Sequence, residues 1–556
     1  MASYTSAQSG NWDTESTWGD GYPVAGDTVT IQDGDTVTLD SATACATLTI
    51  DNGGTLTDAT NNVGLTVSGA SIINGTLTGG AAALSLGSGV TATFALTMGD
   101  GATFTGGSGA NTIGSVNTST TSGNTLTLTR GTTTFDSAYA TNGLTIAFDS
   151  DTTFNHSNGT VAFTRAGTQL INDTASTART FYNIIVNNAS CVVKFENGNG
   201  FALTIANDFT ITAGEFDTSE ETSGTSRNLT VDGVTNVSGT LTCNASTCIF
   251  GDGNSNESTL KMESGGTFNG GSGTHTIWSL RLSNCTYTCT SGTTTIAGYN
   301  GFAGNHYAMV FISETFNHND GTIVFSHASE NQELWCSLEV THTFYNLIIN
   351  KTAGTVLYGE DNGFAIIVAN DLTITSGTLS TTEESSGNDW DLSVTGDTTI
   401  TDTLTCNTST ITVTGGITNT GTLTPGTSTF VLDGTAQSLT GSMTFWHFTK
   451  SVAATDKLTF DNTATYTFGG NVTLTGASGN LLSLASNSTG NAFDFVMSSG
   501  AVKTSLTYLA VTDSDASSSD ATQKPIQPTN STDVSGNTDW FGDVVKGANI
   551  LNNYYY

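Results

Sequence analysis

The sequence predicts an all-β chain folded as a right-handed parallel β-helix (β-solenoid), a rod with capped ends. Three observations lead to this prediction. Strand alternation of apolar and polar residues persists nearly everywhere, while no helical periodicity lasts ten residues. A long segment of the chain is repeated. The composition is 36% hydrophobic with 64 Gly, 4 Pro and only 11% charged residues, which favours stacked short strands over a disordered chain.

The repeat is defined by short motifs that recur in the same order. Residues 154–160 return at 316–322, and residues 181–187 return at 344–350. A third motif, Thr-Leu-Thr-Cys-Asn, is centred near Cys243 in the first copy and near Cys406 in the second. A long period built of short strands is typical of a solenoid, in which each coil packs only on its neighbours.

Two antiparallel architectures compete with the solenoid, a string of sandwiches and a propeller. Both need regular hairpins, and a propeller blade has only ~40–50 residues, far fewer than this repeat. At an assumed ~20–25 residues per coil, one repeat makes roughly seven coils. Stacked at ~4.8 Å, the coils of the whole chain would make a rod on the order of 100 Å long.

We expect five segments along the chain. Residues 1–70 form an N-terminal cap and the first coils, residues 71–263 the first repeat unit, and residues 264–414 the second. Residues 415–500 hold a degraded third copy, and residues 501–556 hold the closing coils and a tail. Because stacked coils share one core, these segments are parts of one solenoid rather than separate domains.

The first strands show the expected pattern clearly. Val29 and Ile31 should face the core while Thr28 and Thr30 face outward, because side chains alternate along a strand. Gly34 supplies the turn that follows, where a positive φ is needed.

Two tryptophans near the N-terminus are predicted to cover the open end of the core. Terminal coils of a solenoid must close that end, and Trp12 and Trp18 are large enough to do so. A sugar-binding platform is the alternative interpretation. With Trp12, Trp18-Gly19 and the sequence Pro-Val-Ala-Gly-Asp at residues 23–27, this opening resembles G8-like and related β-strand-repeat proteins. The resemblance implies a β-helical fold, found in bacterial surface and phage virion proteins, rather than any activity.

The C-terminal part is similar to the closing coils of the same β-strand-repeat proteins. The similarity covers residues 506–540, with an Asp-Ser-Asp loop and a Gly-Asn-x-x-Trp ending at Trp540. We expect Trp540 to plug the far end of the core. Beyond it, residues 554–556 are three tyrosines, a residue type that anchors partner surfaces well.

Charge and targeting signals narrow the compartment. Lys plus Arg number 13 and Asp plus Glu number 48, so the net charge is −35. Such a surface repels phosphate backbones and anionic membranes, so we do not expect the chain to bind nucleic acid. From residues 1–556 we expect no secretory signal peptide and no apolar membrane span. A virion protein, which leaves its host by lysis, would reconcile this with an extracellular composition, as would a shortened chain.

The eight cysteines form no CxxC pair, and no histidine cluster accompanies them in the sequence, so no zinc site is predicted. Cys285 and Cys289, four apart, should lie on one strand face as small core residues. A disulfide between Cys243 and Cys248 across a turn is the alternative for that pair.

Two glutamate pairs are candidates for catalytic carboxylates, Glu220–Glu221 and Glu383–Glu384. Glycoside hydrolases use two carboxylates at ~5–9.5 Å, and β-helical phage tailspikes cut polysaccharide in this way. Adjacent residues on a strand point to opposite faces, however, and both pairs lie in polar corner sequences. No catalytic residue, cofactor site or metal site is therefore predicted.

Oxygen-rich turns and histidines complete the candidates. Residues 252–257 and 513–515 could hold a structural calcium, although the first lacks the residues that complete an EF-hand and a solvated turn is the default. His156 and His318 occupy equivalent repeat positions, which favours a corner hydrogen bond. No GxSxG or P-loop motif occurs.

The function expected from these observations is a non-enzymatic bacteriophage virion protein: a β-helical fibre, spike or head appendage that is structural or binds the host surface. The expected partners are further copies of the chain in a homo-oligomer such as a trimer, other virion proteins, and host surface glycans. No nucleic acid and no membrane insertion are expected. A bacterial cell-surface adhesin and a polysaccharide-degrading tailspike are the alternatives.

Overall fold

The computed structural model describes residues 1–118, 123–251, 253, 257–301, 305–337, 341–359, 365–383 and 389–542. In these residues the chain is a nearly all-β solenoid of parallel strands with about 21 turns, as the sequence predicts. Their helical content is limited to α1 (Glu15–Trp18) and a 3-10 turn at Ala521–Gln523. No helix in the described ranges is long and apolar enough to cross a membrane.

Each coil is built from short strands whose side chains alternate between core and surface. In β3 (Thr28–Ile31) Val29 and Ile31 are fully buried, and the two threonines are half-buried, as predicted. The chain turns where the backbone takes positive φ, as at Gly34, where φ is 80°. A residue with a Cβ is strained in that conformation, so glycine and asparagine gather at the corners.

Pairing between coils is parallel and in register. Thr28 pairs with Thr47 on the next coil, whereas Val116 pairs with Ile146 on the next coil. The coil that begins at Val116 therefore contains many more residues than the coil that begins at Thr28. The nearly constant coil length assumed from the sequence is therefore wrong. In this longer coil the strands stay short, so the extra residues lie between them.

The chain divides into two compact units. Unit 1 comprises Met1–Gly304 and Ala308–Gly321, and unit 2 comprises Asn305–Tyr307 and Thr322–Tyr556. The five sequence segments proposed above rest on motif repetition, which is a different criterion.

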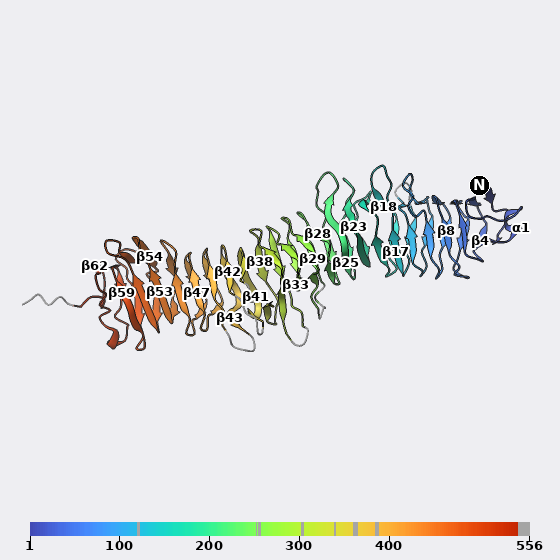
Figure 1. The fold of residues 1–556 in the computed structure, drawn as a ribbon. Coiled ribbons are helices and arrows are strands. Elements are labelled where there is room, and N and C mark those ends of the chain that lie inside the picture. Colours follow the sequence, from blue (N-terminus) through green and yellow to red (C-terminus); the bar gives the residue numbers. More distant parts are fainter. Residues whose placement is uncertain are drawn as a thin grey trace, which may run out of the picture. The chain divides into compact units, whose positions relative to one another are not determined.

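The described strands of unit 1 fall into three columns of parallel strands (Figure 1, blue to green). The first column contains β1 (Ser3–Thr5), β3, β6 (Thr47–Ile50), β9 (Ser71–Ile73), β12 (Leu96–Met98), β15 (Val116–Asn117), β18 (Leu144–Phe148) and β21 (Gly167–Asp173). The second contains β5 (Thr43–Cys45), β8 (Leu65–Val67), β11 (Leu84–Leu86), β14 (Asn111–Ile113), β17 (Thr132–Phe135) and β20 (Thr160–Phe163). The third contains β2 (Gly10–Asn11), β4 (Thr36–Thr38), β7 (Thr55–Thr57), β10 (Thr76–Thr78), β13 (Thr103–Thr105), β16 (Thr125–Thr127) and β19 (Thr153–Asn155).

Two long strands then reorganise the columns. Strand β23 (Asn183–Phe195) pairs with both β20 and β21, and β25 (Phe209–Glu220) follows it. Three columns continue from there. They contain β22 (Arg179–Phe181), β24 (Leu203–Ile205), β26 (Leu229–Val231), β29 (Cys248–Phe250), β32 (His275–Ile277) and β35 (Thr293–Ile296); β27 (Thr235–Val237), β30 (Leu260–Met262), β33 (Leu280–Ser283) and β36 (Tyr307–Ile312); and β28 (Thr240–Thr242), β31 (Thr267–Asn269), β34 (Thr286–Thr288) and β37 (Thr315–Asn317).

Unit 2 has the same plan (Figure 1, yellow to red). The first column contains β38 (Thr322–Phe325), β41 (Asn346–Tyr358), β43 (Leu372–Glu383), β45 (Thr398–Ile400), β48 (Ile417–Asn419), β51 (Ser438–Thr440), β54 (Asp456–Phe460), β57 (Leu482–Ser486), β60 (Leu509–Thr512) and β62 (Thr532–Ser535). The second contains β40 (His342–Phe344), β42 (Ile366–Val368), β44 (Leu392–Val394), β47 (Thr410–Val413), β50 (Thr429–Leu432), β53 (His447–Ser451), β56 (Asn471–Thr475) and β59 (Val502–Thr507). The third begins with β39 (Gln332–Cys336), β46 (Thr403–Thr405) and β49 (Thr422–Thr424), and is followed by a separate four-stranded sheet of β52 (Met443–Phe445), β55 (Thr465–Phe468), β58 (Phe493–Met497) and β61 (Ser514–Asp515). Strands β39 and β46 are joined through the long strands β41 and β43.

The structure reproduces the sequence repeat. Strands β23 and β41 both have 13 residues, and β25 and β43 both have 12. The register shifts within the two pairs also fall at equivalent places, between Val186 and Asn187 and between Ile349 and Asn350. The repeated motifs are therefore equivalent strand segments, as the sequence indicates.

The tryptophans predicted to cap the core are buried. Trp12 is fully buried and donates from Nε1 to the Pro23 carbonyl, while Trp18 donates to the Trp12 carbonyl at 2.7 Å. Their rings meet edge to face at 5.2 Å. In unit 2, Trp540 is fully buried against Phe495, with ring centres 4.8 Å apart. Buried rings with satisfied N–H groups fit a plug and leave no face for a sugar to stack on.

Buried lysines are a feature of unit 2 that the sequence did not indicate. Lys450 is fully buried, donates to Gln437 Oε1 at 2.7 Å and lies 3.0 Å from Asp456. Lys351 is also fully buried and donates to Gln332 Oε1 at 3.1 Å, and burial lowers its pKa to about 8. An unpaired charge in the core would be costly, so each ammonium group needs these polar partners. By binding them, each buried lysine stabilises the corner in which it lies.

We expect Trp12→Ala to loosen the first coils. Loss of a fully buried tryptophan costs about 3–5 kcal/mol, and a solenoid unfolds locally because each coil depends on its neighbours. Hydrogen exchange of the β3 amides should therefore accelerate strongly. The control is Trp446→Ala in unit 2, where the side chain is 38% exposed. Unchanged exchange in β3 for Trp12→Ala would contradict the capping role.

Candidate functional site

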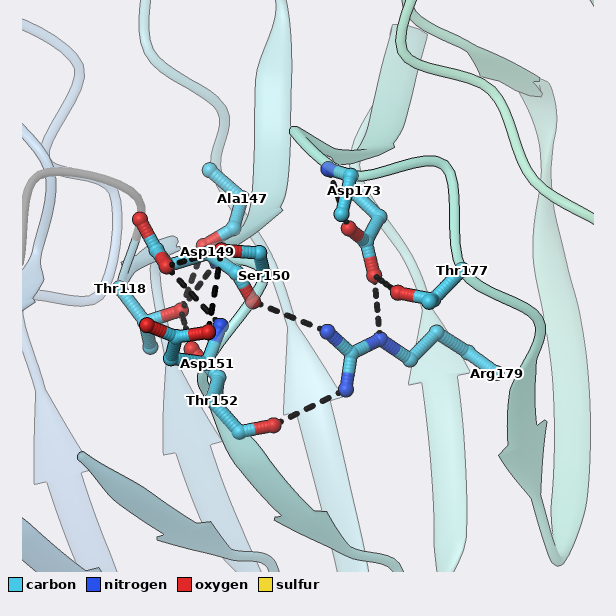
Figure 2. Close-up of polar contacts among 10 residues, drawn as sticks. Thr118, Ala147, Asp149, Ser150, Asp151, Thr152, Asp173, Thr177 and Arg179 are labelled. Carbon is cyan, nitrogen blue, oxygen red and sulfur yellow. Dashed lines mark hydrogen bonds and ion pairs between the residues drawn. The ribbon is translucent and has the colours of Figure 1, made fainter. Parts of the chain in front are cut away.

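An arginine clasp joins neighbouring corners of unit 1 (Figure 2). The Arg179 guanidinium donates to Asp173 Oδ2 at 2.5 Å and to the carbonyls of Thr152 and Asp149, each at 3.0 Å. Its carbon lies 4.8 Å from the centre of the Phe148 ring. The guanidinium is thus engaged by protein groups on several sides, which makes Arg179 a structural clasp that sequence inspection did not single out.

The first candidate glutamate pair is split between core and solvent, as predicted. Glu220 is 2% exposed, and its carboxylate accepts hydrogen bonds from the amides of Gly198 and Gly200, the Ser223 hydroxyl and Arg227. Burial alone would raise its pKa, but the hydrogen bonds from Gly198, Ser223 and Arg227 and the arginine charge outweigh it and lower the pKa to about 2. A general acid needs the opposite shift.

The neighbouring and repeated glutamates do not complete a catalytic pair among the described residues. Glu221 is exposed and lies 3.8 Å from Lys194. In the second copy, Glu383 is 2% exposed and accepts a hydrogen bond from Trp390 Nε1 at 2.9 Å. Glu384 lies outside the described residues. The described carboxylates of these corners therefore hold the chain in place.

The repeated histidines form the expected corner hydrogen bonds. His156 Nδ1 accepts from the Asn158 amide at 3.0 Å, and His318 Nδ1 accepts from the Asp320 amide at 3.1 Å. Asn158 and Asp320 both have positive φ, 58° and 53°. The histidine therefore stabilises a tight turn in each copy.

The two oxygen-rich turns differ in what can be said of them. Of residues 252–257, Asp252 and residues 254–256 lie outside the described part, as does the tyrosine tail at 554–556. At the other turn, the Asp513 carboxylate accepts from the Gly490 amide at 2.8 Å, and Asp515 accepts from the Ser517 amide at 2.8 Å. Ser514 Oγ accepts from Trp540. These oxygens accept hydrogen bonds within the closing coils.

Among the described residues, one group of side chains has the geometry to hold a metal ion. The thiols of Cys243 and Cys248 and a ring nitrogen of His275 all lie within 4.8 Å of one another, and all three residues are buried. Both cysteines are free thiols, so the alternative of a disulfide between them is not formed. The sequence has no histidine cluster beside these cysteines, but the fold brings one histidine, His275, next to them from the following coil.

The fold explains how these residues meet. Cys243 follows β28 and begins the turn, Asn244 takes a positive φ of 52°, and Cys248 starts β29. Cys248 pairs directly with His275 across the parallel ladder between β29 and β32. A hydrogen bond from Cys243 lowers the pKa of Cys248, burial opposes this, and the nearby His275 lowers it further. Burial raises the pKa of Cys243.

A weak signal for this group was present in the sequence. The Cys-x4-Cys spacing lies at the upper end of what structural zinc sites use. The histidine lies one full coil beyond Cys248, a separation that has meaning only once the coil length at that point is known. The other described cysteines are buried core residues, including Cys285 and Cys289, as predicted.

A shallow groove of about 420 Å³ lies over a corner of unit 1. It is lined mainly by glycine, serine, threonine and alanine, and Glu215 supplies its one carboxylate among the lining residues. A retaining or inverting glycosidase needs two carboxylates across its substrate, so this lining does not match that chemistry.

Residues 17–142 match the G8 domain family. The matched segment includes Trp18-Gly19 and residues 23–27 of the opening that resembles G8-like proteins in sequence. No curated protein and no solved structure matches the chain. A β-solenoid with a segment similar to the G8 domain family suggests a structural or surface repeat protein.

We expect Glu220→Gln to destabilise the chain by roughly 1–3 kcal/mol at pH 7, because a buried arginine-bound carboxylate is lost. The pKa of Glu220 is lower in the folded chain than its ordinary 4.5, so this stabilisation is present above that pH and disappears as pH falls toward about 2. Urea unfolding at pH 7 and pH 3 checks this. Glu221→Gln is the control, and an equal effect of both changes would contradict the account.

Proposed function

We propose that this chain is a non-enzymatic structural protein of a bacteriophage virion, a fibre, spike or head appendage. The observation that carries the proposal is the doubled unit, seen in the paired long strands β23 and β25, and β41 and β43. Copying a unit of stacked coils lengthens a scaffold without adding a new site. An elongated particle appendage is a role in which length itself is useful.

The side chains support a mechanical role. The repeated carboxylates Glu220 and Glu383 and the repeated histidines His156 and His318 bond to their own corners. Recurrence at equivalent positions therefore follows from the needs of each coil. The net charge of −35 favours solubility outside a cell and disfavours binding to nucleic acid.

The proposal includes self-association, as a trimer, and contacts with other virion proteins and host surface glycans. Outward strand positions carry some exposed apolar side chains, such as Ile72 at 44% and Ile249 at 36%. Association would remove these from water. The chain's hydroxyl-rich outer strand faces could form hydrogen bonds with sugars.

Immunogold labelling tests the virion assignment. Antibodies against the purified chain should label particles of the virus that encodes it at a fixed position on head or tail. Particles made from a genome with this gene deleted are the control. Label on the bacterial envelope with none on particles would contradict the proposal and favour an adhesin.

Light scattering tests the oligomer. The purified chain should show three times the mass of one chain across a range of concentrations, because the proposed trimer is a permanent assembly of the particle. The mass of a single chain at all concentrations would contradict the trimer. It would not affect the virion assignment, which the immunogold experiment tests separately.

A further inference from the structure

We propose that Cys243, Cys248 and His275 bind a zinc ion inside unit 1. Two thiolates and one imidazole are the ligand types that zinc prefers, and the three ligand atoms lie within 4.8 Å of one another. Zinc bonds of ~2.3 Å to sulfur and ~2.0–2.1 Å to nitrogen set ligand separations of roughly 3.5 Å, so small side-chain rotations close the site. This inference does not depend on the proposed virion role.

The histidine supplies an independent observation. His275 is 1% exposed, and its ring nitrogens have no hydrogen-bond partner among the described atoms other than the adjacent Cys248 thiol, which is a weak one. A buried imidazole with so little hydrogen bonding is costly, because both nitrogens have lost water. A metal bond to one nitrogen would offset that cost, and the two thiols lie where the other ligands would be needed.

An earlier coil shows what a polar residue normally does at this position. The Thr-Phe-x-Gly-Gly-Ser-Gly motif aligns His275 with Asn111, and Cys248 with Leu84. Asn111 accepts a hydrogen bond from the Leu84 amide at 3.0 Å and donates to the Gly106 carbonyl at 2.8 Å. The asparagine is therefore satisfied by backbone, whereas the histidine in its place is not.

The second repeat copy shows the apolar version of the same place. Cys406 corresponds to Cys243, but Ile411 corresponds to Cys248 and pairs with Phe430, as Cys248 pairs with His275. Ile411 and Phe430 are each 1% exposed. An isoleucine and a phenylalanine thus fill the core well, so packing alone does not call for a thiol and an imidazole there.

Charge balance also suits zinc. Two thiolates neutralise Zn²⁺ and a neutral imidazole adds no charge, so the site carries no net charge into the core. A fourth position remains for water or another group, as in zinc sites with three protein ligands. Because the ligands are buried, the ion would enter as the coils form, which couples binding to folding.

The test is metal content after refolding. The full chain is unfolded under reducing conditions, refolded with Zn²⁺, dialysed and assayed by mass spectrometry of the metal. We expect about one Zn²⁺ per chain. Refolding with Co²⁺ should give a thiolate-to-metal charge-transfer absorption, which reports sulfur ligands directly.

Matched variants come from the chain itself. Cys248→Ile and His275→Phe introduce the residues found in the second copy, and His275→Asn introduces the residue found in the earlier coil. All three variants should fold, as judged by circular dichroism. Their zinc content per chain should fall by more than about tenfold relative to the wild-type chain. Cys406→Ala and Cys289→Ala are the controls, because they remove buried thiols elsewhere. Both control variants should keep the bound zinc. Should one variant misfold, the other two still decide.

Three results would overturn the proposal. The wild-type chain could refold without stoichiometric zinc, the Cys248 and His275 variants could retain as much zinc as the Cys406 control, or peptide mapping could find a Cys243–Cys248 disulfide in the refolded, reduced protein.

Discussion

The register between consecutive coils is the constraint on which the rest of the structure depends. Strands of consecutive coils pair in parallel along each column, so the same kinds of side chain stack above one another, as Phe268 stacks on Tyr287 with ring centres 4.7 Å apart. Coils can differ in length, as the pairs Thr28–Thr47 and Val116–Ile146 show, only because corners absorb the difference. The corners therefore carry the positive φ values and the polar side chains that fix them.

That constraint explains why chemistry-bearing residues lie inside the molecule. A corner brings backbone amides and carbonyls into the core, and each needs a partner. Glu220, Arg179 and Lys450 supply those partners with charged groups that are themselves held by hydrogen bonds or ion pairs. Such groups resemble catalytic residues in a sequence, but they stabilise turns. The Cys243, Cys248 and His275 group differs, because the histidine nitrogens have no such backbone partners.

The sequence predicted the fold well because strand alternation is local. Val29 and Ile31 could be assigned to the core, Trp12 and Trp540 to the ends, and His156 to a corner, from pattern alone. The metal-ligand group could not be predicted in this way. Cys248 and His275 meet only through the register, and coil length varies too much to count from one coil to the next. The buried Lys450 was missed for a different reason: strand alternation does not reveal that a charged side chain finds partners inside a corner, as Lys450 does with Gln437 and Asp456.

A crystal structure at side-chain resolution tests the central claim most directly, that in-register parallel coils build this chain. The account predicts Thr28 opposite Thr47 in unit 1 and Leu372 opposite Thr398 in unit 2, with strands about 4.8 Å apart. Antiparallel hairpins at these positions, or a register shifted by one residue that turns Val29 outward, would contradict it.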